Sequence, residues 1–408
     1  MSVTLLTFGC RLNAHESDAM EHLARQGLGQ EGHTIIVNSC TVTAEAERQA
    51  RQAIRRAHRE NPSARIIVTG CASERAAEAW AALPGVAKVI PNTEKTHPST
   101  WGLPEEAGRT PPPSRYIRAL LQVQQGCDND CTFCVIPAGR GQSTSMPLAD
   151  IIPKARALTE AGHCEIVLTG VDIASWQHGG QGLGQLCRHL LDEVPEIARL
   201  RLSSIDPMIL TPKEGDHALW QLIADEPRFM PHLHLSLQAG SDLILKRMKR
   251  RHNTQDVAKL VQHVRRLRPD AGFGADVIAG FPTETETLFQ ETYEFLAEQA
   301  IPFLHVFPYS ERPGTPAARM PSIPRAIRQE RAAKLRHLGH EVREQFLRRF
   351  IRQEKTVLME SPTSGHTPEF AAFTLTSAPQ NMPPTQRGRL ERIRILKVQD
   401  GLLLAEIL

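Results

Sequence analysis

Three cysteines stand close together in the sequence and could act together as ligands. The run Gly126–Cys134 holds Cys127, Cys131 and Cys134 in a C-x3-C-x2-C pattern, with Phe133 directly before the last cysteine. A four-iron cluster normally takes four thiolates, so a loop that offers only three leaves one iron open to bind another molecule. An iron–sulfur cluster with an open iron is therefore the first interpretation of this loop.

A structural zinc site is the alternative interpretation of the same cysteines. Zinc ligands usually come as C-x2-C pairs with a second pair or with histidines at a matching spacing. No second pair lies nearby, since His163 follows a predicted helix from Pro147 to Ala161 and Cys164 begins a predicted buried strand. The x3 gap and the aromatic residue favour the cluster over zinc.

Three further cysteines, Cys10, Cys40 and Cys71, lie about thirty residues apart in similar local contexts. Each follows a short apolar, β-branched run and precedes a helical pattern, which predicts a strand-to-helix turn. Such turns lie on one edge of a parallel sheet, where open α/β sheets place their ligands, so the three thiols could converge on a second cluster. Taken singly, a cysteine at a strand end is more often a small buried apolar residue, and Cys164 and Cys187 are interpreted that way.

The composition is that of a globular protein with more than one core. The chain has 408 residues, of which 41% are hydrophobic and 23% are charged, and this length predicts two or three domains. No stretch is as long and apolar as a membrane span. Eight cysteines without a recognisable export signal indicate a reducing compartment, so we expect a cytoplasmic protein without a membrane partner.

Basic residues are unevenly distributed, although the net charge is only +3. Lysine and arginine outnumber acidic residues over residues 325–355, and a second basic group, which includes Arg48, Arg51 and Arg55, lies in a predicted helix. A solvated helix face explains any one such run. Two runs that flank a cluster-binding region favour a polyanionic partner such as RNA.

The elements that position these residues follow from the remaining pattern. A Pro-, Thr- and Gly-rich stretch over residues 91–114, with three prolines at 111–113, predicts a linker. After it, strand-like runs alternate with helical patterns, which predicts a parallel sheet that is either doubly wound or an open partial barrel. The runs cover residues 116–124, 165–169, 199–203, 232–237, 272–278 and 302–307.

The end of the chain predicts a helix and a small β-structure. A long basic helix is predicted from Arg325 to Arg352. Short apolar alternations after Glu354 predict a small β-barrel, which either binds nucleic acid or caps the neighbouring region.

With both cysteine sets placed, the chain resembles the methylthiotransferase family of radical S-adenosylmethionine enzymes over essentially its whole length. Further runs similar to that family are Leu168–Asp172, Arg201–Pro207, His232–Ser241 and Asp276–Thr285. The resemblance implies an α/β fold in three parts with two connecting segments. These are an N-terminal flavodoxin-like α/β domain (1–92), a linker (93–114), a central partial (β/α)6 barrel that is the radical S-adenosylmethionine core (115–324), a basic linking helix (325–353) and a small RNA-binding β-barrel of the TRAM type (354–408).

The resemblance also implies two 4Fe-4S clusters and S-adenosylmethionine as cofactors. Cys10, Cys40 and Cys71 would hold an auxiliary cluster, and Cys127, Cys131 and Cys134 the radical cluster. The residues expected to contact S-adenosylmethionine are Phe133, Thr169, Gly170, Ser204, Asp206, Gln238 and Val277. Those expected to contact RNA are Arg48, Arg51, Arg55, Arg328 and Arg349.

Two residues depart from the family pattern. Asp206 stands where the family usually has Glu, and its side chain is one methylene shorter, so it could accept the same hydrogen bond through a water molecule. Thr283 stands where Gly is usual, and we expect this change only to stiffen a turn.

Within the family, three short runs are most similar to the branch that modifies N6-threonylcarbamoyladenosine at position 37, beside the tRNA anticodon. These runs are Cys40–Thr43, Val68–Cys71 and His305–Ser310. The implied reaction methylates a sulfur on the auxiliary cluster with one S-adenosylmethionine and cleaves a second to give a radical that removes the hydrogen from C2 of adenine. The implied partners are tRNA and an electron donor such as flavodoxin or ferredoxin, and the sulfur donor stays unknown.

Three alternatives remain open at this point. A sister branch acts on N6-isopentenyladenosine, and a third branch acts on an aspartate of a ribosomal protein. Outside catalysis, an iron–sulfur protein that binds RNA or senses redox state would also carry cysteine clusters. Two three-cysteine sites argue against that reading, because a purely structural cluster is normally closed by a fourth ligand.

Overall fold

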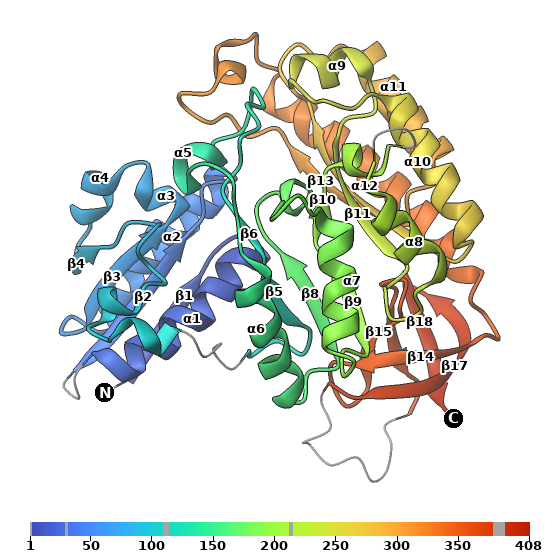
Figure 1. The fold of residues 1–408 in the computed structure, drawn as a ribbon. Helices are drawn as coiled ribbons and strands as arrows, with labels where there is room; N and C mark the ends of the chain where they lie inside the picture. Colours follow the sequence, from blue (N-terminus) through green and yellow to red (C-terminus); the bar gives the residue numbers. More distant parts are fainter. Residues whose placement is uncertain (1, 29–31, 109–113, 212–214, 378–387) are drawn as a thin grey trace.

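The computed structural model describes residues 2–28, 32–108, 114–211, 215–377 and 388–408, and Figure 1 shows three regions in chain order. An N-terminal α/β region (blue) lies beside a central region of strands and helices, and a small barrel (red) lies against another side of the centre. The proline run 111–113, which supported the predicted linker, lies outside the described residues. Within the described parts, no helix combines the length and the apolar character needed to cross a membrane.

The N-terminal region is a parallel sheet whose strands lie in chain order. The strands are β1 (Ser2–Thr7), β2 (His33–Ser39), β3 (Arg65–Gly70) and β4 (Val86–Val89), and the helices are α1 (Arg11–Gly27), α2 (Ala44–Glu60), α3 (Cys71–Glu74) and α4 (Ala77–Ala81). Alternate side chains of β2 cover both faces, since Ile36 packs with Met20 of α1 and Ile35 packs with Ile54 of α2. The predicted strand-to-helix turns at Cys10, Cys40 and Cys71 are therefore confirmed, and all three lie on one edge.

The central region is an open barrel of parallel strands, which is one of the two arrangements that the six predicted runs allowed and the one that the family resemblance implied. Its strands are β5 (Ala119–Gln122), β8 (Glu165–Thr169), β9 (Arg199–Leu202), β10 (Ser204–Ile205), β11 (His232–Gln238), β12 (Gly272–Ala279) and β13 (Phe303–Pro308). They form the sheets β5-β8-β9 and β10-β11-β12-β13, and only Ser203 separates β9 from β10. The two sheets thus continue one another around a partial barrel.

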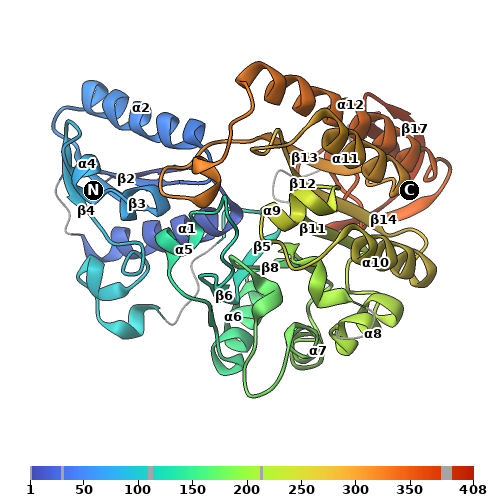
Figure 2. The ribbon, with the colours of Figure 1, turned by 90° about the horizontal axis from the view of Figure 1, so that it is seen from above.

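Helices cover the outer face of this barrel (Figure 2). They are α6 (Leu148–Glu160), α7 (Leu183–Glu193), α8 (His217–Asp225), α9 (Asp242–Arg247), α10 (Thr254–Leu267) and α11 (Glu286–Glu298). Their apolar faces pack with the strands in one continuous core, in which Leu168, Leu235 and Ile151 are fully buried. Cys187 is buried in the same core, as expected, whereas Cys164 is only half-buried at the start of β8.

A long helix connects the centre to the C-terminus. α12 runs from Arg325 to Arg348, so the predicted helical end at Arg352 is four residues too late. Arg352 has a positive φ of 68°, and its N–H donates to Ile395 of the C-terminal barrel at 2.8 Å, which shows that tertiary pairing ends the helix. Several of its basic side chains serve packing, since Arg331 pairs with Glu284 at 2.8 Å and Arg336 donates to the Val306 carbonyl at 2.9 Å.

The C-terminal strands close into a small barrel in the order β14-β15-β16-β18-β17. They are β14 (Glu354–Met359), β15 (Ser364–His366), β16 (Ala372–Leu375), β17 (Leu390–Gln399) and β18 (Leu402–Ile407). The loop before β16 covers the N-terminal end of the central strands: Phe370 stacks on His232 at 4.8 Å, and Arg201 donates to the Pro368 carbonyl at 3.0 Å. This small barrel therefore acts as a cap of the central region, whatever else it binds.

Candidate active site

The structure brings Cys10, Cys40 and Cys71 together at the shared edge of the N-terminal sheet. A Cβ atom on Gly9 would lie only 2.5 Å from the Cys40 sulfur, and Gly9 has a φ of +97°, so glycine is required beside Cys10. Burial raises the pKa of Cys40 to about 11, with a smaller contribution from the neighbouring charges of Cys10 and Cys71. The convergence expected from strands about thirty residues apart is thus present.

A buried ionic network lies behind this cysteine set. Glu16 of α1 pairs with Lys95 at 2.7 Å and with Arg140 at 2.8 Å, and all three side chains are almost fully buried. Burial alone would raise the pKa of Glu16, but the two cations hold it at about 2. Arg140 also donates from Nε to the Cys71 sulfur at 3.1 Å and belongs to α5 (Ile136–Arg140), just after the other cysteine loop. One side chain therefore connects the two cysteine sets.

Sequence reasoning missed this network. Glu16 lies six positions after Cys10 on a helix, and Asn13 lies three positions before Glu16, so the spacing offered a weak signal of a shared face. Asn13 does accept a hydrogen bond from Arg140. Nothing in the sequence linked Arg140 to Cys71, because 69 residues separate them.

The second cysteine set lies on the loop that follows β6 (Gln124–Gln125), and its cysteines are half-buried. The backbone N–H groups of Asn129 and Ile136 donate to the sulfurs of Cys127 and Cys134, each at 3.4 Å. Burial raises the pKa of Cys134 to about 11. N–H donors to sulfur stabilise the thiolates that an iron–sulfur cluster needs.

Arg250 supports the third sulfur of this loop. Its guanidinium donates to Cys131 at 3.5 Å and to Asp206 at 2.9 Å. Asp206 is buried and also accepts from the Met208 N–H at 3.0 Å, so its carboxylate positions Arg250 and does not line the cavity described below. The same ion pair explains how an aspartate can serve at this position.

The sulfur spacing does not favour a single metal ion at either cysteine set. A tetrahedral zinc ion with Zn–S bonds of about 2.3 Å holds its sulfurs about 3.8 Å apart. Among the described residues, three His, Cys, Asp or Glu ligand atoms all within 4.8 Å of one another occur at His234, Asp276 and His305, and at neither cysteine set. Each set also has one arginine on a sulfur, which balances part of the negative charge of three thiolates and a cluster.

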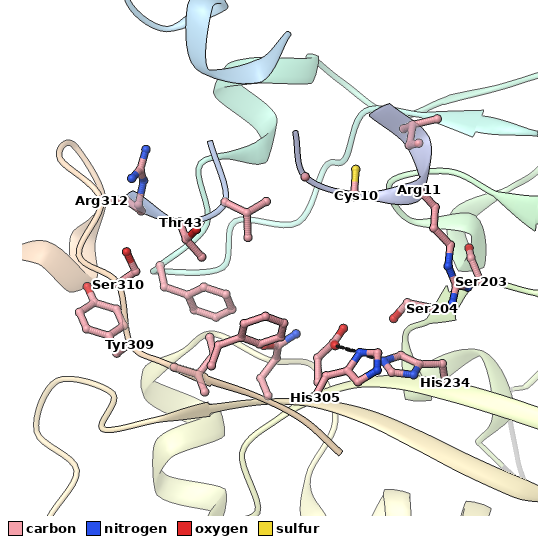
Figure 3. Close-up of a pocket in the computed structure, with 18 of the residues that line it drawn as sticks. Cys10, Arg11, Thr43, Ser203, Ser204, His234, His305, Tyr309, Ser310 and Arg312 are labelled. Atoms are coloured by element: carbon pink, nitrogen blue, oxygen red, sulfur yellow. Dashed lines mark ion pairs between the residues drawn. The ribbon is translucent and has the colours of Figure 1, made fainter. Parts of the chain in front are cut away.

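A cavity of about 570 Å³ lies between the two cysteine sets (Figure 3). Cys10 and Thr43 line it from the N-terminal region, and His234, His305 and Tyr309 line it from the central barrel. Five of the residues expected to contact S-adenosylmethionine face this cavity: Phe133, Thr169, Gly170, Ser204 and Gln238. The other two do not, because Asp206 pairs with Arg250 and Val277 is fully buried in the barrel core.

Gln238, which lines the cavity, and Thr283, which lies outside it, carry unusual backbone angles. Gln238 has a φ of 75° at an irregularity in the pairing of β11 with β12, which re-aims its side chain. Thr283 has a φ of 69°, so threonine here adopts a conformation that favours glycine. Arg247 donates to both the carbonyl and the hydroxyl of Thr283, at 3.1 and 2.9 Å, and so holds the turn in place.

Polar groups gather on one side of the cavity. His234 and His305 both contact Oδ1 of Asp276, at 3.1 and 3.4 Å. Burial alone would raise the pKa of Asp276, but the two imidazole hydrogen bonds hold it below its ordinary value, so the carboxylate stays ionised. These three side chains could hold a small cation, and together with Arg11 they were not selected from the sequence.

The basic residues expected to contact RNA divide into two groups. Arg48 and Arg55 lie exposed on α2, and Arg51 on the same helix stacks over Trp80 at 4.1 Å. In contrast, Arg328 donates to the Tyr309 carbonyl at 2.8 Å and Arg349 donates to the Pro269 carbonyl at 2.6 Å. The last two thus already serve contacts within the chain.

Known proteins resemble this chain over both of its cysteine-bearing regions. The family model described as "Uncharacterized protein family UPF0004" matches residues 2–91, and "Radical SAM superfamily" matches residues 121–296. Among solved structures, the radical S-adenosylmethionine methyltransferase TsrM from Kitasatospora setae, with cobalamin and a [4Fe-4S] cluster bound, covers 85% of this chain and 73% of its own, with a TM-score of 0.51 and 15% identity. That likeness shows the fold.

Curated relatives extend the likeness to nearly the whole chain. The threonylcarbamoyladenosine tRNA methylthiotransferase MtaB of Rickettsia prowazekii is 42% identical over 396 residues, which is 91% of this chain and 90% of the relative. The protein of the same name from Aquifex aeolicus is 35% identical (88% and 95%), and the tRNA-2-methylthio-N(6)-dimethylallyladenosine synthase of Cereibacter sphaeroides is 31% identical (82% and 85%). The chain belongs to the radical S-adenosylmethionine methylthiotransferases, enzymes that use S-adenosylmethionine and two 4Fe-4S clusters to transfer a methylthio group.

Proposed function

We propose that this enzyme methylthiolates C2 of N6-threonylcarbamoyladenosine at position 37 of tRNA. The observation that carries the proposal is the cavity between the two cysteine sets, with Cys10 on one wall and Phe133 and Gln238 on the other. A base held there lies between a sulfur-carrying site and a radical-generating site. The relatives at 42% and 35% identity bear the name of this activity, which favours this branch over the dimethylallyl branch at 31%.

The chain's own residues prepare this cavity for the reaction. When bound, the two clusters and S-adenosylmethionine supply a methylated sulfur for transfer and a carbon radical that removes one hydrogen atom. Cys10, Cys40 and Cys71 would hold one cluster, and Cys127, Cys131 and Cys134 the other. Thr169, Gly170, Ser204 and Gln238 would orient S-adenosylmethionine, and Phe133 and Phe307 present apolar side chains to the space between.

RNA would approach over α2. The N-terminus of this helix forms part of the cavity rim, since Val42 and Thr43 line the cavity and the Ala44 N–H donates to Ser310 at 3.1 Å. Arg48 and Arg55 lie farther along the same helix, and their charges suit a phosphate backbone beside the opening. Arg48 pairs with Glu45 but is exposed, whereas Arg51, Arg328 and Arg349 would contribute less, because each packs on an aromatic ring or donates to a backbone carbonyl.

The proposal also assigns a role to each region of the chain. Residues 1–92 would carry the auxiliary cluster, 115–324 the radical chemistry, 325–353 the linking helix and 354–408 an RNA-binding barrel, with 93–114 as the linker. The enzyme would act in the cytoplasm on tRNA, with flavodoxin or ferredoxin as electron donor. Methylthiolation at an unreactive C–H bond requires a radical, so no acid–base pair is assigned.

The test is mass spectrometry of tRNA nucleosides from a strain that lacks the gene. We expect 2-methylthio-N6-threonylcarbamoyladenosine to be absent, to return with the wild-type gene, and to stay absent with Cys10→Ala, Cys40→Ala or Cys131→Ala. Loss of the 2-methylthio isopentenyl nucleoside instead would assign the enzyme to the sister branch. An unchanged nucleoside profile would contradict a tRNA substrate and direct the search to ribosomal protein.

A further inference from the structure

The cavity between the cysteine sets has a cation that lacks a counter-charge. Arg11, which directly follows Cys10, reaches along the cavity toward Ser203, Ser204 and His234 (Figure 3). Among the described residues Arg11 makes no hydrogen bond or ion pair, and its nearest aromatic contact is the Phe370 ring at 5.8 Å. Arg11 is exposed to the cavity, and a guanidinium that lines a cavity without a partner is able to bind an anion.

The surroundings of Arg11 add positive charge. Desolvation, and then the charges of Arg118 and Arg201, lower the pKa of Arg11, whereas the charges of Asp276 and Glu165 raise it. Each of these two arginines has its own carboxylate, because Arg118 pairs with Glu360 at 2.8 Å and Arg201 pairs with Glu165 at 2.6 Å. Among the described residues, none of these acidic groups lies within ion-pair distance of Arg11.

The other charges of the cavity are already paired. Asp276 accepts from His234 and His305, and Arg312 on the opposite side pairs with Glu47 at 2.7 Å. Among the charged side chains described in the cavity lining, Arg11 is the one without a partner. The side of the cavity around Arg11 thus has no carboxylate in direct contact with the Arg11 guanidinium among the described residues.

We propose that Arg11 binds the carboxylate of the threonyl group on the substrate nucleoside and so selects that nucleoside. This inference rests on the proposed function and names the part of the substrate that the cavity would recognise. N6-Threonylcarbamoyladenosine carries one carboxylate on its N6 substituent, whereas the isopentenyl substituent of the sister substrate is uncharged. A hydrocarbon substituent would leave Arg11 without a partner in a site already rich in positive charge.

Hydroxyl and imidazole groups beside Arg11 suit the rest of the threonylcarbamoyl group. Ser203 lies in the cavity lining beside Arg11 (Figure 3), and the His305 ring in the same lining is half-exposed. These groups can exchange hydrogen bonds with a urea-like linker and a hydroxyl. Because Arg11 follows Cys10 directly, a carboxylate fixed on Arg11 also fixes the base relative to the auxiliary cysteine set.

S-Adenosylmethionine also carries a carboxylate and is therefore the other ligand that Arg11 could bind. The two ligands are distinguished by changing one of them at a time. The enzyme with both clusters assembled is given an anticodon stem-loop that contains either N6-threonylcarbamoyladenosine or its carboxamide, in which the charge is removed and the shape is kept. Formation of the 2-methylthio product and of 5′-deoxyadenosine are both measured.

For the wild-type enzyme, we expect kcat/KM to be about tenfold to a hundredfold lower for the carboxamide, the range of a hydrogen-bonded charge pair. Arg11→Gln should lower kcat/KM for the carboxylate substrate by a similar factor and abolish the preference between the two stem-loops. Arg11→Lys should keep most of the preference. Arg25→Gln, at the far end of the same helix, is the matched control and should behave as wild type.

Three outcomes would overturn the proposal in distinguishable ways. Equal turnover of both stem-loops by the wild-type enzyme removes the carboxylate contact and leaves the proposed function standing. No turnover of either stem-loop removes the proposed function as well. A loss of 5′-deoxyadenosine formation in Arg11→Gln without RNA, matched by a raised KM for S-adenosylmethionine, reassigns Arg11 to that cofactor. Because the carboxamide comparison uses wild-type enzyme, it holds even where the variant fails to assemble its clusters.

Discussion

The two cysteine sets reach similar surroundings by opposite routes. Cys127, Cys131 and Cys134 lie within eight residues of one loop, and two of their sulfurs accept hydrogen bonds from N–H groups of the same loop. Cys10, Cys40 and Cys71 come from three strand ends, and the ionic network of Glu16, Lys95 and Arg140 lies behind them. In each set one arginine from elsewhere in the chain donates to one sulfur.

The two sites differ in what holds their sulfur ligands in position. The loop site depends on local backbone geometry, so its donors survive most side-chain changes. The sheet-edge site depends on buried charges from two regions, so it should be coupled to global stability. Arg140 is the point of contact between them, because it lies six residues after Cys134 and touches Cys71. Single substitutions should therefore be able to affect one site without the other.

Removing one cysteine from each set should have the largest effect. Cys131→Ala should abolish cleavage of S-adenosylmethionine and leave the iron of the auxiliary site in place, while Cys40→Ala should keep some cleavage and lose methylthiolation. The reason is that each set supplies three thiolates to its own cluster. Iron content, 5′-deoxyadenosine and methylthiolated product are measured on both proteins. Equal loss of both clusters in either variant would disprove two separate sites.

Glu16→Gln should be the most destabilising change that leaves every cysteine in place. It leaves Lys95 and Arg140 buried without their shared carboxylate, and breaking a buried ion pair costs about 3–5 kcal/mol. Chemical denaturation checks the unfolding free energy, and iron analysis should show loss at the auxiliary site first. Glu60→Gln, which breaks an exposed pair with Arg56, is the control and should cost at most about 1 kcal/mol.

The difference in unfolding free energy between wild type and Glu16→Gln should change with pH in a definite direction. The folded-state pKa of Glu16 is about 2, below its ordinary value of 4.5, so its stabilisation is present above pH 4.5 and is lost as pH falls toward 2. The gap between wild type and Glu16→Gln should therefore be constant from pH 7 to 5 and shrink below 4.5. A gap that changes between pH 7 and 5 would contradict an ionised Glu16 as its cause.

The features that the sequence predicted are those whose signals lie close together along the chain. The loop cysteines and the six central strands could be predicted because spacing and apolar runs lie within a few residues. The convergence of Cys10, Cys40 and Cys71 followed from repeated strand-to-helix turns. Arg140 and Arg250 could not be found, because they lie 69 and 119 residues from the sulfurs they contact. The predicted C-terminal end of α12 was wrong for a related reason. The hydrogen bond from Arg352 to Ile395, in a distant part of the chain, overrides helix propensity.

Arg250→Gln should affect the loop site with a smaller change in stability. The variant removes the guanidinium from Cys131 and leaves the buried Asp206 with Arg251 at 3.5 Å as its remaining partner. Loss of a positive charge beside a cluster disfavours its reduced form, so we expect a lower reduction potential, by an amount on the order of tens of millivolts, and slower cleavage of S-adenosylmethionine. Redox titration followed by electron paramagnetic resonance measures it. An unchanged potential with slower cleavage would show that Arg250 acts on S-adenosylmethionine instead.

The smallest effects should come from one asparagine at each site. The Asn129 side chain donates to Cys127 at 3.4 Å and to Asp172 at 2.8 Å, and its backbone N–H also donates to the Cys127 sulfur. Asn129→Ala therefore keeps one of two donors to that sulfur, and we expect cleavage to slow by less than about threefold. Asn92 is buried at the auxiliary site and donates to the Gly139 carbonyl at 2.5 Å, and no backbone group replaces that contact in Asn92→Ala. We therefore expect Asn92→Ala to lose about 1–3 kcal/mol of unfolding free energy and Asn129→Ala, whose side chain is only half-buried, to lose less. The reverse order would show that the loop site, and not the sheet-edge site, depends on side chains for its geometry.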